Sequence, residues 1–292
     1  MRLRVWLLIV AGIVLAVGAP VNQVVAQTTP KAKGLTLSPL RTETTIAPGT
    51  SQKAALRVSN TTDKPMVVGL NAEEFRVVNQ DYDYAFSADA AAASWVSFAL
   101  KEVTIAPGKV RDITYSINVP LGSEPGGRYL SLFASADGLS DVNTVHSRQR
   151  VGSLVYLTVG GDVTRAGALL SLTSPWSVVG DAEWSATIRN SGTTHFRSIY
   201  SVTTQTLWGQ SVASNQGSAL IFPGSIRRIG DTVPLPVVPG LYKVVYRIGL
   251  GDTPRSERTS IIVFSPPSTW ILVAGLLGLG LVLRSVHQKR RK

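Results

Sequence analysis

Arg111-Asp-Ile-Thr-Tyr-Ser-Ile-Asn-Val119 alternates strictly between polar and apolar residues over most of its length. Successive side chains of a β-strand point to opposite faces, so this alternation puts Ile113, Tyr115, Ile117 and Val119 on one face. A strand with one apolar face packs that face into a core and leaves the other in water. The segment therefore predicts a half-buried antiparallel strand.

Similar segments recur between Gln27 and Ser265, where helical periodicity is nearly absent. They are bounded by Gly, Pro, Asn or Asp, residues that favour turns. Further segments of this kind are 54–60, 154–159 and 241–248. Many short strands separated by closely spaced turns are typical of antiparallel β-sandwiches.

An internal repeat supports this fold class. The pentapeptide Thr-Ile-Ala-Pro-Gly occurs at 45–49 and again at 104–108, and looser versions end at Gly224 and Gly240. Proline presets φ and glycine accepts φ > 0, so each Pro-Gly pair suits a turn that leads into a strand.

A second repeat is a strand that ends in asparagine, at 56–60 and at 186–190. Each copy is followed by a polar turn and a new strand, so the same pattern occurs once in each half of the chain. We therefore predict an all-β protein with two tandem immunoglobulin-like antiparallel sandwiches, 34–162 and 163–265.

Both ends of the chain carry apolar stretches with basic flanks. Residues 1–26 begin with Met-Arg-Leu-Arg, continue through an apolar run and close with small residues, as a secretory signal peptide does. Residues 268–286 are largely apolar, and 287–292 are mostly basic. Because cations stay on the cytoplasmic side of a membrane segment, we expect one transmembrane helix at 268–286, a cytoplasmic tail at 287–292 and an extracellular ectodomain at the cell membrane.

The formal charge of +11 is concentrated at these ends. Seven of the 29 basic residues lie in the terminal segments, so the ectodomain holds 22 basic and 18 acidic residues. The excess orients the chain in a membrane, and we expect no nucleic-acid partner. The chain has no cysteine, and its three histidines, His146, His195 and His287, are far apart. We therefore expect no metal cluster, no catalytic residues and no cofactor, and we predict that the protein is not an enzyme.

The first predicted sandwich resembles the peptidoglycan-binding domain of WxL-interacting proteins from Gram-positive cell surfaces. The residues that carry the resemblance are Leu37-Ser-Pro-Leu-Arg41, Val58-Ser-Asn60, Trp95-Val-Ser-Phe98, the two Ala-Pro-Gly turns, and Val119-Pro with Glu124-Pro-Gly-Gly-Arg-Tyr129. The resemblance implies a membrane-anchored, non-catalytic adhesion protein whose first sandwich contacts peptidoglycan or a cell-surface protein. No motif of the second sandwich matches that family.

The same half of the chain is similar to the N-terminal domain of pilus-type periplasmic chaperones, which donate a strand edge to an unfinished subunit. This second resemblance implies a tethered, strand-donating assembly chaperone. Arg41 would be its anchoring arginine and Gln149–Val159 its donor strand. The interpretation requires an open, apolar strand edge near Gln149–Val159.

The candidate binding residues are aromatic and arginine side chains of the first sandwich: Arg41, Tyr82, Tyr84, Phe86, Arg128 and Tyr129. Tyr82, Tyr84 and Phe86 fall in a predicted loop, where aromatic rings either stack on sugars or pin the loop to the domain. The two arginines present planar forks either to a ligand carboxylate or to a carboxylate of the protein itself.

Three further pairs of residues have structural interpretations. Trp95 and Phe98 start a predicted strand and are typical of a sandwich core. Asp81 and Asp83 are spaced like the start of a calcium loop, but the later ligands and the glycine of that loop are absent. The adjacent Glu73-Glu74 pair would point to opposite faces of a strand, so it does not form a glycosidase pair.

Overall fold

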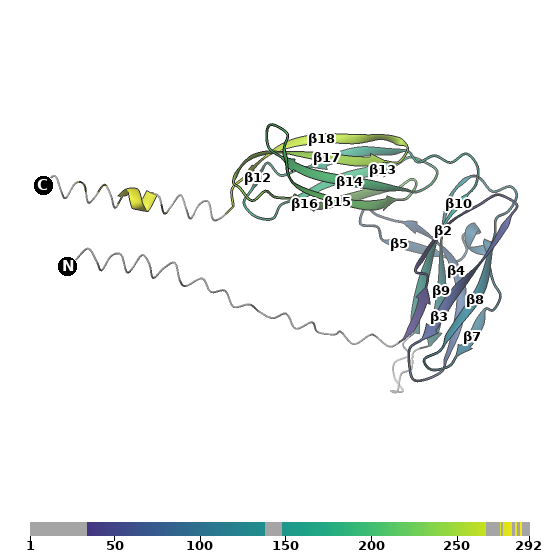
Figure 1. The fold of residues 1–292 in the computed structure, drawn as a ribbon. Helices are drawn as coiled ribbons and strands as arrows, with labels where there is room; N and C mark the ends of the chain where they lie inside the picture. Colours follow the sequence, from purple (N-terminus) through teal and green to yellow (C-terminus); the bar gives the residue numbers. More distant parts are fainter. Residues whose placement is uncertain are drawn as a thin grey trace, which may run out of the picture. The chain divides into compact units, whose positions relative to one another are not determined.

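The computed structural model describes residues 34–137 and 148–266, together with helical residues at 275, 277–281, 284 and 287. These residues belong to one compact unit, Gly34–Lys292. The predicted signal peptide, 1–26, lies outside the described residues. Within them the chain is built mostly from β-strands, which confirms the predicted all-β class (Figure 1).

The first sandwich consists of a four-stranded and a six-stranded sheet. The four-stranded sheet has the order β1 (Leu35–Ser38), β3 (Ser51–Asn60), β8 (Val110–Asn118), β6 (Val96–Phe98). The six-stranded sheet has the order β2 (Arg41–Ile46), β10 (Arg148–Val159), β9 (Gly126–Asp137), β4 (Met66–Val77), β5 (Tyr84–Ser87), and β7 (Glu102–Ile105) also pairs with β4. A short 3-10 helix, η1 (Ala91–Trp95), lies between β5 and β6.

Apolar side chains from these two sheets meet in one core. Ile113, Tyr115 and Ile117, the face predicted from the alternation in β8, are buried there beside Leu132 of β9 and Leu157 of β10. Burying an apolar side chain of this size contributes about 1.5–3 kcal/mol. The strict period-2 pattern thus gave the correct inward face.

The second sandwich pairs a three-stranded with a five-stranded sheet. The three-stranded sheet has the order β11 (Gly167–Thr173), β13 (Glu183–Asn190), β16 (Ile226–Thr232). The five-stranded sheet has the order β12 (Ser177–Val178), β18 (Thr253–Phe264), β17 (Gly240–Leu250), β14 (Phe196–Gln205), β15 (Ser211–Ile221). Its core packs Trp184 and Ile188 of β13 against Val244, Tyr246 and Ile262 of the larger sheet.

The repeated Pro-Gly turn and the repeated asparagine form one structural motif in the first sandwich. Asn60 is buried, and its backbone N–H donates to the carbonyl of Lys109 (3.0 Å), directly after the turn at Gly108. Gly108 has the positive φ of 65° that such a turn needs. The Asn60 side chain donates to the carbonyl of Ile105 (3.0 Å), so it ties β3 to the strand that precedes the turn.

The second sandwich repeats this motif. Asn190 is fully buried, and its backbone N–H donates to the carbonyl of Ser225 (3.0 Å), directly after the turn at Gly224. Its side chain donates to the carbonyls of Ile221 (2.8 Å) and Thr194 (2.9 Å). The repeated asparagine in the sequence therefore marks the same buried hydrogen-bonded link in both sandwiches.

Beyond β18, only part of the predicted transmembrane segment 268–286 is described. Its described residues, Gly275, Leu277–Leu281 and Arg284, are helical. Among the described residues, no helix has both the length and the hydropathy that a membrane span requires.

Candidate functional site

Strand β10 is paired on both sides along only half of its length. Strand β9 accompanies it from Arg148 to Val159, whereas β2 runs parallel to it only from Leu154 to Val159. The covered part begins where the N–H of Leu154 donates to the carbonyl of Leu40 (2.9 Å). Residues 148–153 of β10 form an edge that no other described strand covers, and we call them the open edge.

The open edge presents the backbone groups of alternate residues. The N–H of Leu154 points toward β2, and the pairing of β10 with β9 has no register shift. The N–H and C=O groups of Arg148, Arg150 and Gly152 therefore point to the same side as those of Leu154. An edge of this kind offers donors and acceptors to an added strand.

Two side chains link the region around the open edge to the start of the chain. Ser153 Oγ donates to the carbonyl of Pro39 (2.6 Å), and Gln149 Oε1 accepts a hydrogen bond from the N–H of Leu35 (3.0 Å). Strand β1 is thus connected to β10 through a glutamine side chain, and no described strand forms a backbone ladder with 148–153 on this side.

A polar groove of about 440 Å³ lies on the outer face of the six-stranded sheet, and it is lined by residues of β4 and β9 and by two arginines of the open edge. Its charged lining residues are Lys101, Arg148, Arg150 and Glu73. Three cations thus face one carboxylate, which makes the groove basic and attractive to anions.

Arg150 is held over the outer face of the six-stranded sheet. Its guanidinium pairs with the carboxylate of Glu73, and its Cζ lies 3.5 Å from the ring centroid of Phe133, a cation–π contact. Asn71 Nδ2 donates to the same Glu73 carboxylate (3.0 Å). These contacts fix one wall of the groove.

The open edge differs from the donor strand that the chaperone interpretation expects. Arg148 and Arg150 are its exposed side chains, whereas Val151 packs against the core. From Leu154 onward β2 covers the edge. The expected edge is therefore open only over 148–153, and there it is basic instead of apolar.

The four aromatic residues of the predicted binding set lie at or beside the place where the second sandwich packs on the first. A buried cluster at this place, which we call the junction cluster, comprises Phe75, Tyr82, Tyr129, Tyr156, Leu220 and Phe222. Tyr84 and Phe86 contact Phe75 at ring-centroid distances of 5.0 and 6.0 Å, and 38% and 41% of these two side chains stays exposed.

Tyr82 is pinned to the second sandwich. Its hydroxyl accepts a hydrogen bond from the N–H of Phe222 (3.1 Å) and lies 3.1 Å from Ser225 Oγ. Arg227 Cζ lies 4.1 Å from its ring centroid, and burial raises the pKa of the Tyr82 phenol. Among the described residues, Tyr82 is the one non-glycine with positive φ (68°), a conformation that persists where surrounding contacts hold it.

Tyr129 joins the two sandwiches through His195. The Tyr129 hydroxyl accepts a hydrogen bond from the backbone N–H of His195 (3.0 Å) and lies 3.1 Å from its Nδ1. Burial raises the pKa of Tyr129 far above its ordinary value and lowers the pKa of His195. Both groups are therefore neutral at physiological pH, as a buried hydrogen-bonded pair requires.

The two candidate arginines have partners within the chain. Arg41 lies 3.5 Å from the carboxylate of Glu43, which is also 3.8 Å from Arg197 of the second sandwich, and Arg41 Cζ lies 5.7 Å from the ring centroid of Tyr156. Arg128 Nη1 donates to the carbonyl of Gly127 (3.0 Å). The two contacts of Glu43 are exposed ion pairs, which contribute about 0–1 kcal/mol each.

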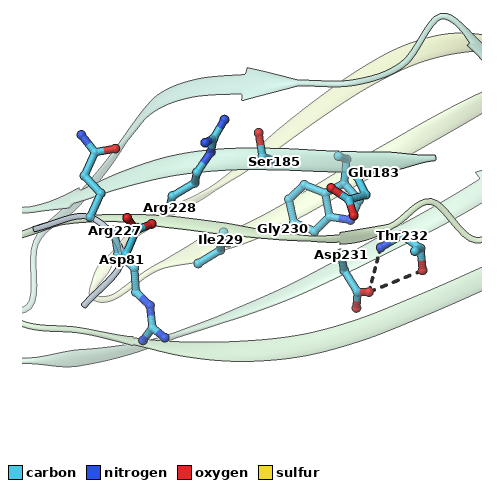
Figure 2. Close-up of a pocket in the computed structure, with 11 residues that line it drawn as sticks. Asp81, Glu183, Ser185, Arg227, Arg228, Ile229, Gly230, Asp231 and Thr232 are labelled. Carbon is cyan, nitrogen blue, oxygen red and sulfur yellow. Dashed lines mark hydrogen bonds between the residues drawn. The ribbon is translucent and has the colours of Figure 1, made fainter. Parts of the chain in front are cut away.

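A second cavity, of about 650 Å³, lies along β13 and β16 (Figure 2). Arg227 and Arg228 extend from opposite faces of β16, and the carboxylate of Asp231 accepts hydrogen bonds from the N–H of Thr232 (2.7 Å) and from Asn215 Nδ2 (2.8 Å). Arg227 also donates to a backbone carbonyl. Because several of these groups already bind each other or the backbone, the cavity is a weaker candidate site than the open edge.

Several residues of the remaining pairs that the sequence singled out make contacts within the protein. Trp95 and Phe98 pack against the first core. Asp83 closes a turn, since its N–H donates to Asn79 Oδ1 (3.0 Å) and its carboxylate accepts from Asn79 Nδ2 (2.7 Å). Among the described residues, no three His, Asp or Glu side chains gather where they could hold a metal ion.

Sequence reasoning missed the residues that the second sandwich contributes to the junction. Phe222 was visible only as the start of a Phe-Pro-Gly turn, and His195 carried no signal. The close approach at Gly126 was also missed, since a Cβ there would lie 2.9 Å from the carbonyl oxygen of Thr193. This glycine therefore lets the two sandwiches approach closely.

Neither a protein-family model nor a curated protein matches the sequence. Solved structures similar to this chain include the class 5 fimbriae chaperone CfaA, with 9% identity, a TM-score of 0.43, and coverage of 79% of this chain and 99% of that one. Another is the Salmonella enterica SafA pilin in complex with the SafB chaperone, with 13% identity, a TM-score of 0.39 and coverage of 80% and 98%. A third is the Pseudomonas aeruginosa CupB2 chaperone, with 13% identity, a TM-score of 0.36 and coverage of 78% and 100%. At these values the similarity assigns no function to the chain.

Proposed function

We propose that the protein is a surface-exposed, non-catalytic binding protein that pairs an extended segment of a protein partner with the open edge of β10. The observation that carries this proposal is the one-sided pairing of β10 along 148–153. An added strand would form main-chain hydrogen bonds with Arg148, Arg150 and Gly152, which is the β-augmentation mode of recognition. Strand pairing at this edge is also what the chaperone resemblance implies.

The side chains around the edge favour an acidic or polar segment. Lys101, Arg148 and Arg150 line the adjacent groove, against the single carboxylate of Glu73. In β-augmentation the main-chain bonds supply affinity and the neighbouring side chains supply preference. We therefore expect the partner segment to carry Asp or Glu at alternate positions, on the outer face of the sheet next to Arg148 and Arg150.

Binding of peptidoglycan is a second candidate, and the exposed rings of Tyr84 and Phe86 favour it. Their centroids lie 6.4 Å apart. Aromatic faces of this kind stack on sugar rings. Tyr82 and Tyr129 are already covered by the second sandwich, so Tyr84 and Phe86 are the candidate aromatic side chains left for a glycan.

The test of the edge uses amide hydrogen exchange and an isotope-labelled full chain. In the free protein the amides of Arg150 and Gly152 should exchange quickly, and an extended acidic peptide with alternating Glu and Val should slow them. A basic peptide of the same length should have no effect. If these amides already exchange as slowly as those paired with β9, the edge is closed and the proposal is wrong.

Arg150→Pro and Arg150→Ala form a matched pair of variants. Proline removes the outward N–H while leaving the ladder to β9 intact, because an edge strand tolerates proline at a position that points away from its partner. We expect Arg150→Pro to abolish peptide binding and Arg150→Ala to weaken it several-fold. For the second candidate, co-sedimentation of the full chain with purified sacculi should depend on Tyr84 and Phe86 and be unaffected by Arg150→Pro.

A further inference from the structure

Large apolar side chains are exposed on every loop at one end of the second sandwich. Trp176 is 78% exposed, Trp208 81%, Val237 95% and Val238 63%. Val179, Leu207, Leu241 and Val263 at the same end are also exposed. We call this set of eight residues the apolar end. Exposed apolar side chains that gather at one end of a domain mark an interaction site.

The strand order brings these residues together. In antiparallel sheets successive loops alternate between the two ends of the sandwich. The loops 191–195 and 222–225 contact the first sandwich through His195 and Phe222. The loops 174–176, 179–182, 206–210 and 233–239 therefore lie at the opposite end, where β17 begins and β18 ends.

The loops of the apolar end are held in place by hydrogen bonds. The carbonyl of Trp176 accepts from the N–H of Val263 (2.9 Å), and the carbonyl of Val238 accepts from the hydroxyl of Tyr242 (2.8 Å). The hairpin that carries Trp208 is closed by a bond from the N–H of Thr206 to the carbonyl of Gln210 (2.8 Å). These hydrogen bonds thus fix the loops that carry the exposed apolar side chains.

The apolar end also has very little charge. Across the four loops 174–176, 179–182, 206–210 and 233–239, Asp181 is the only charged residue. The last of these loops is Val-Pro-Leu-Pro-Val-Val-Pro. A loop surface in water is normally rich in charge and polar groups, so this composition fits contact with an apolar medium.

The chain leaves the second sandwich at the apolar end. Strand β18 ends at Phe264, and the N–H of Ser265 donates to the carbonyl of Val178 in β12 (2.9 Å). The apolar stretch of the sequence begins four residues after Pro266, at Trp270. Four residues of fully extended chain span at most about 14 Å. The predicted membrane segment therefore starts within a short reach of the exposed loops.

We propose that the apolar end rests in the interfacial layer of the lipid bilayer to which the C-terminal segment is anchored. Tryptophan is enriched at this level of a membrane, and apolar faces of interfacial elements sink about 5–10 Å into the boundary of headgroups and acyl chains. Trp176, Trp208, Val237 and Val238 would enter this layer. The inference uses the predicted anchor and is independent of the proposed binding at β10.

A cysteine-free chain makes the test direct, because one introduced cysteine is the only labelling site. Val238→Cys and Ile199→Cys are matched variants: the two side chains are 63% and 66% exposed, but Ile199 lies near the start of β14, toward the first sandwich. Each full-length variant is labelled with an environment-sensitive fluorophore and reconstituted into phosphatidylcholine–phosphatidylglycerol vesicles. Quenching by aqueous iodide and by nitroxide-bearing lipid is then measured.

We expect the label at 238 to be quenched by the nitroxide lipid and shielded from iodide, and the label at 199 to behave in the opposite way. Adding Trp176→Ser and Trp208→Ser should return the 238 label toward the iodide sensitivity of the 199 label. The proposal is overturned if both labels stay equally open to iodide in vesicles that hold the chain, or if the chain does not sediment with vesicles. Shielding that rises with protein density in the bilayer indicates contact between copies, and it overturns the proposal too.

Discussion

Tyr129 of the first sandwich and His195 of the second make two contacts through one hydroxyl group. The phenol oxygen accepts the backbone N–H of His195 at 3.0 Å and lies 3.1 Å from its Nδ1. The Tyr129 ring also packs edge-on against Phe222, with centroids 4.5 Å apart. The two sandwiches are therefore joined by a partly buried polar link next to an aromatic cluster.

Tyr129→Phe should weaken this link without leaving a large cavity. Removing the hydroxyl leaves the partly buried N–H and Nδ1 of His195 without their partner, which costs about 1 kcal/mol or more in the free energy of unfolding. Urea unfolding measured by tryptophan fluorescence checks this value. Tyr84→Phe is the control, because the Tyr84 ring is partly exposed, and its effect should stay within about 0.5 kcal/mol.

The stability of the junction should fall in mild acid. Burial lowers the pKa of His195 in the folded protein, and Arg165, Arg197 and Arg41 add to this effect, while Glu43 opposes it. The pKa of His195 is about 6.5 in the unfolded chain and lower in the folded protein. At a pH between these two pKa values the unfolded chain therefore binds more protons than the folded protein does. The free energy of unfolding therefore decreases as the pH falls through this window.

His195→Gln tests this pH dependence, because glutamine is polar but does not titrate. Urea unfolding at several pH values from neutral to mildly acidic should show a shallower slope for the variant than for the natural chain. An equal slope in both proteins would show that the titration of His195 does not control the junction.

Asn190→Ala should destabilise the second sandwich strongly. Asn190 is fully buried, and its side chain donates to the carbonyls of Ile221 and Thr194, so its removal takes a buried donor away from both carbonyls. We expect a loss of about 1–3 kcal/mol or more in the free energy of unfolding. Asn71→Ala, on the exposed outer face, is the control and should change it by no more than about 0.5 kcal/mol. Equal effects of the two substitutions would contradict the buried hydrogen-bonded link.

Gly126→Ala should loosen the contact between the sandwiches. Gly126 has φ of 144°, and a Cβ there would lie 2.9 Å from the carbonyl oxygen of Thr193. Such a conformation costs a non-glycine residue about 1–3 kcal/mol. Faster exchange of the Gly127 amide, which donates to Thr193 at 2.9 Å, would report the loosening. Gly122→Ala is the matched control, because a Cβ at that position meets no atom within 4 Å.

Much of the fold was predictable from local pattern. The alternation in 111–119 gave the buried face of β8, and the paired asparagines Asn60 and Asn190 marked equivalent positions in two sandwiches. Both signals act over a few residues, since strand geometry and turn chemistry depend on neighbours in the chain. The signal peptide stays a prediction, because residues 1–26 lie outside the described residues, and the membrane helix and the resemblance to WxL-interacting proteins also stay predictions.

The candidate site was less predictable. The sequence indicated Tyr82, Tyr84, Phe86 and Tyr129 as ligand platforms or packing residues, and it could not separate the two roles. Tyr82 and Tyr129 are covered by Phe222 and its neighbours, whereas part of the surface of Tyr84 and Phe86 stays exposed to solvent. The open edge of β10 was expected to be apolar, but its exposed side chains are Arg148 and Arg150.

The amino-acid sequence by itself determined that this chain forms short strands, which side chains of each strand face inward, and where the tight turns fall. These properties follow from alternation and from proline, glycine and asparagine chemistry within a few residues. Only the tertiary structure decided what covers each outward face. Tyr129 contacts His195, which is 66 residues away in the sequence, and β2 does not pair with Arg148–Ser153 of β10. Both features depend on how distant segments pack, which no local pattern encodes.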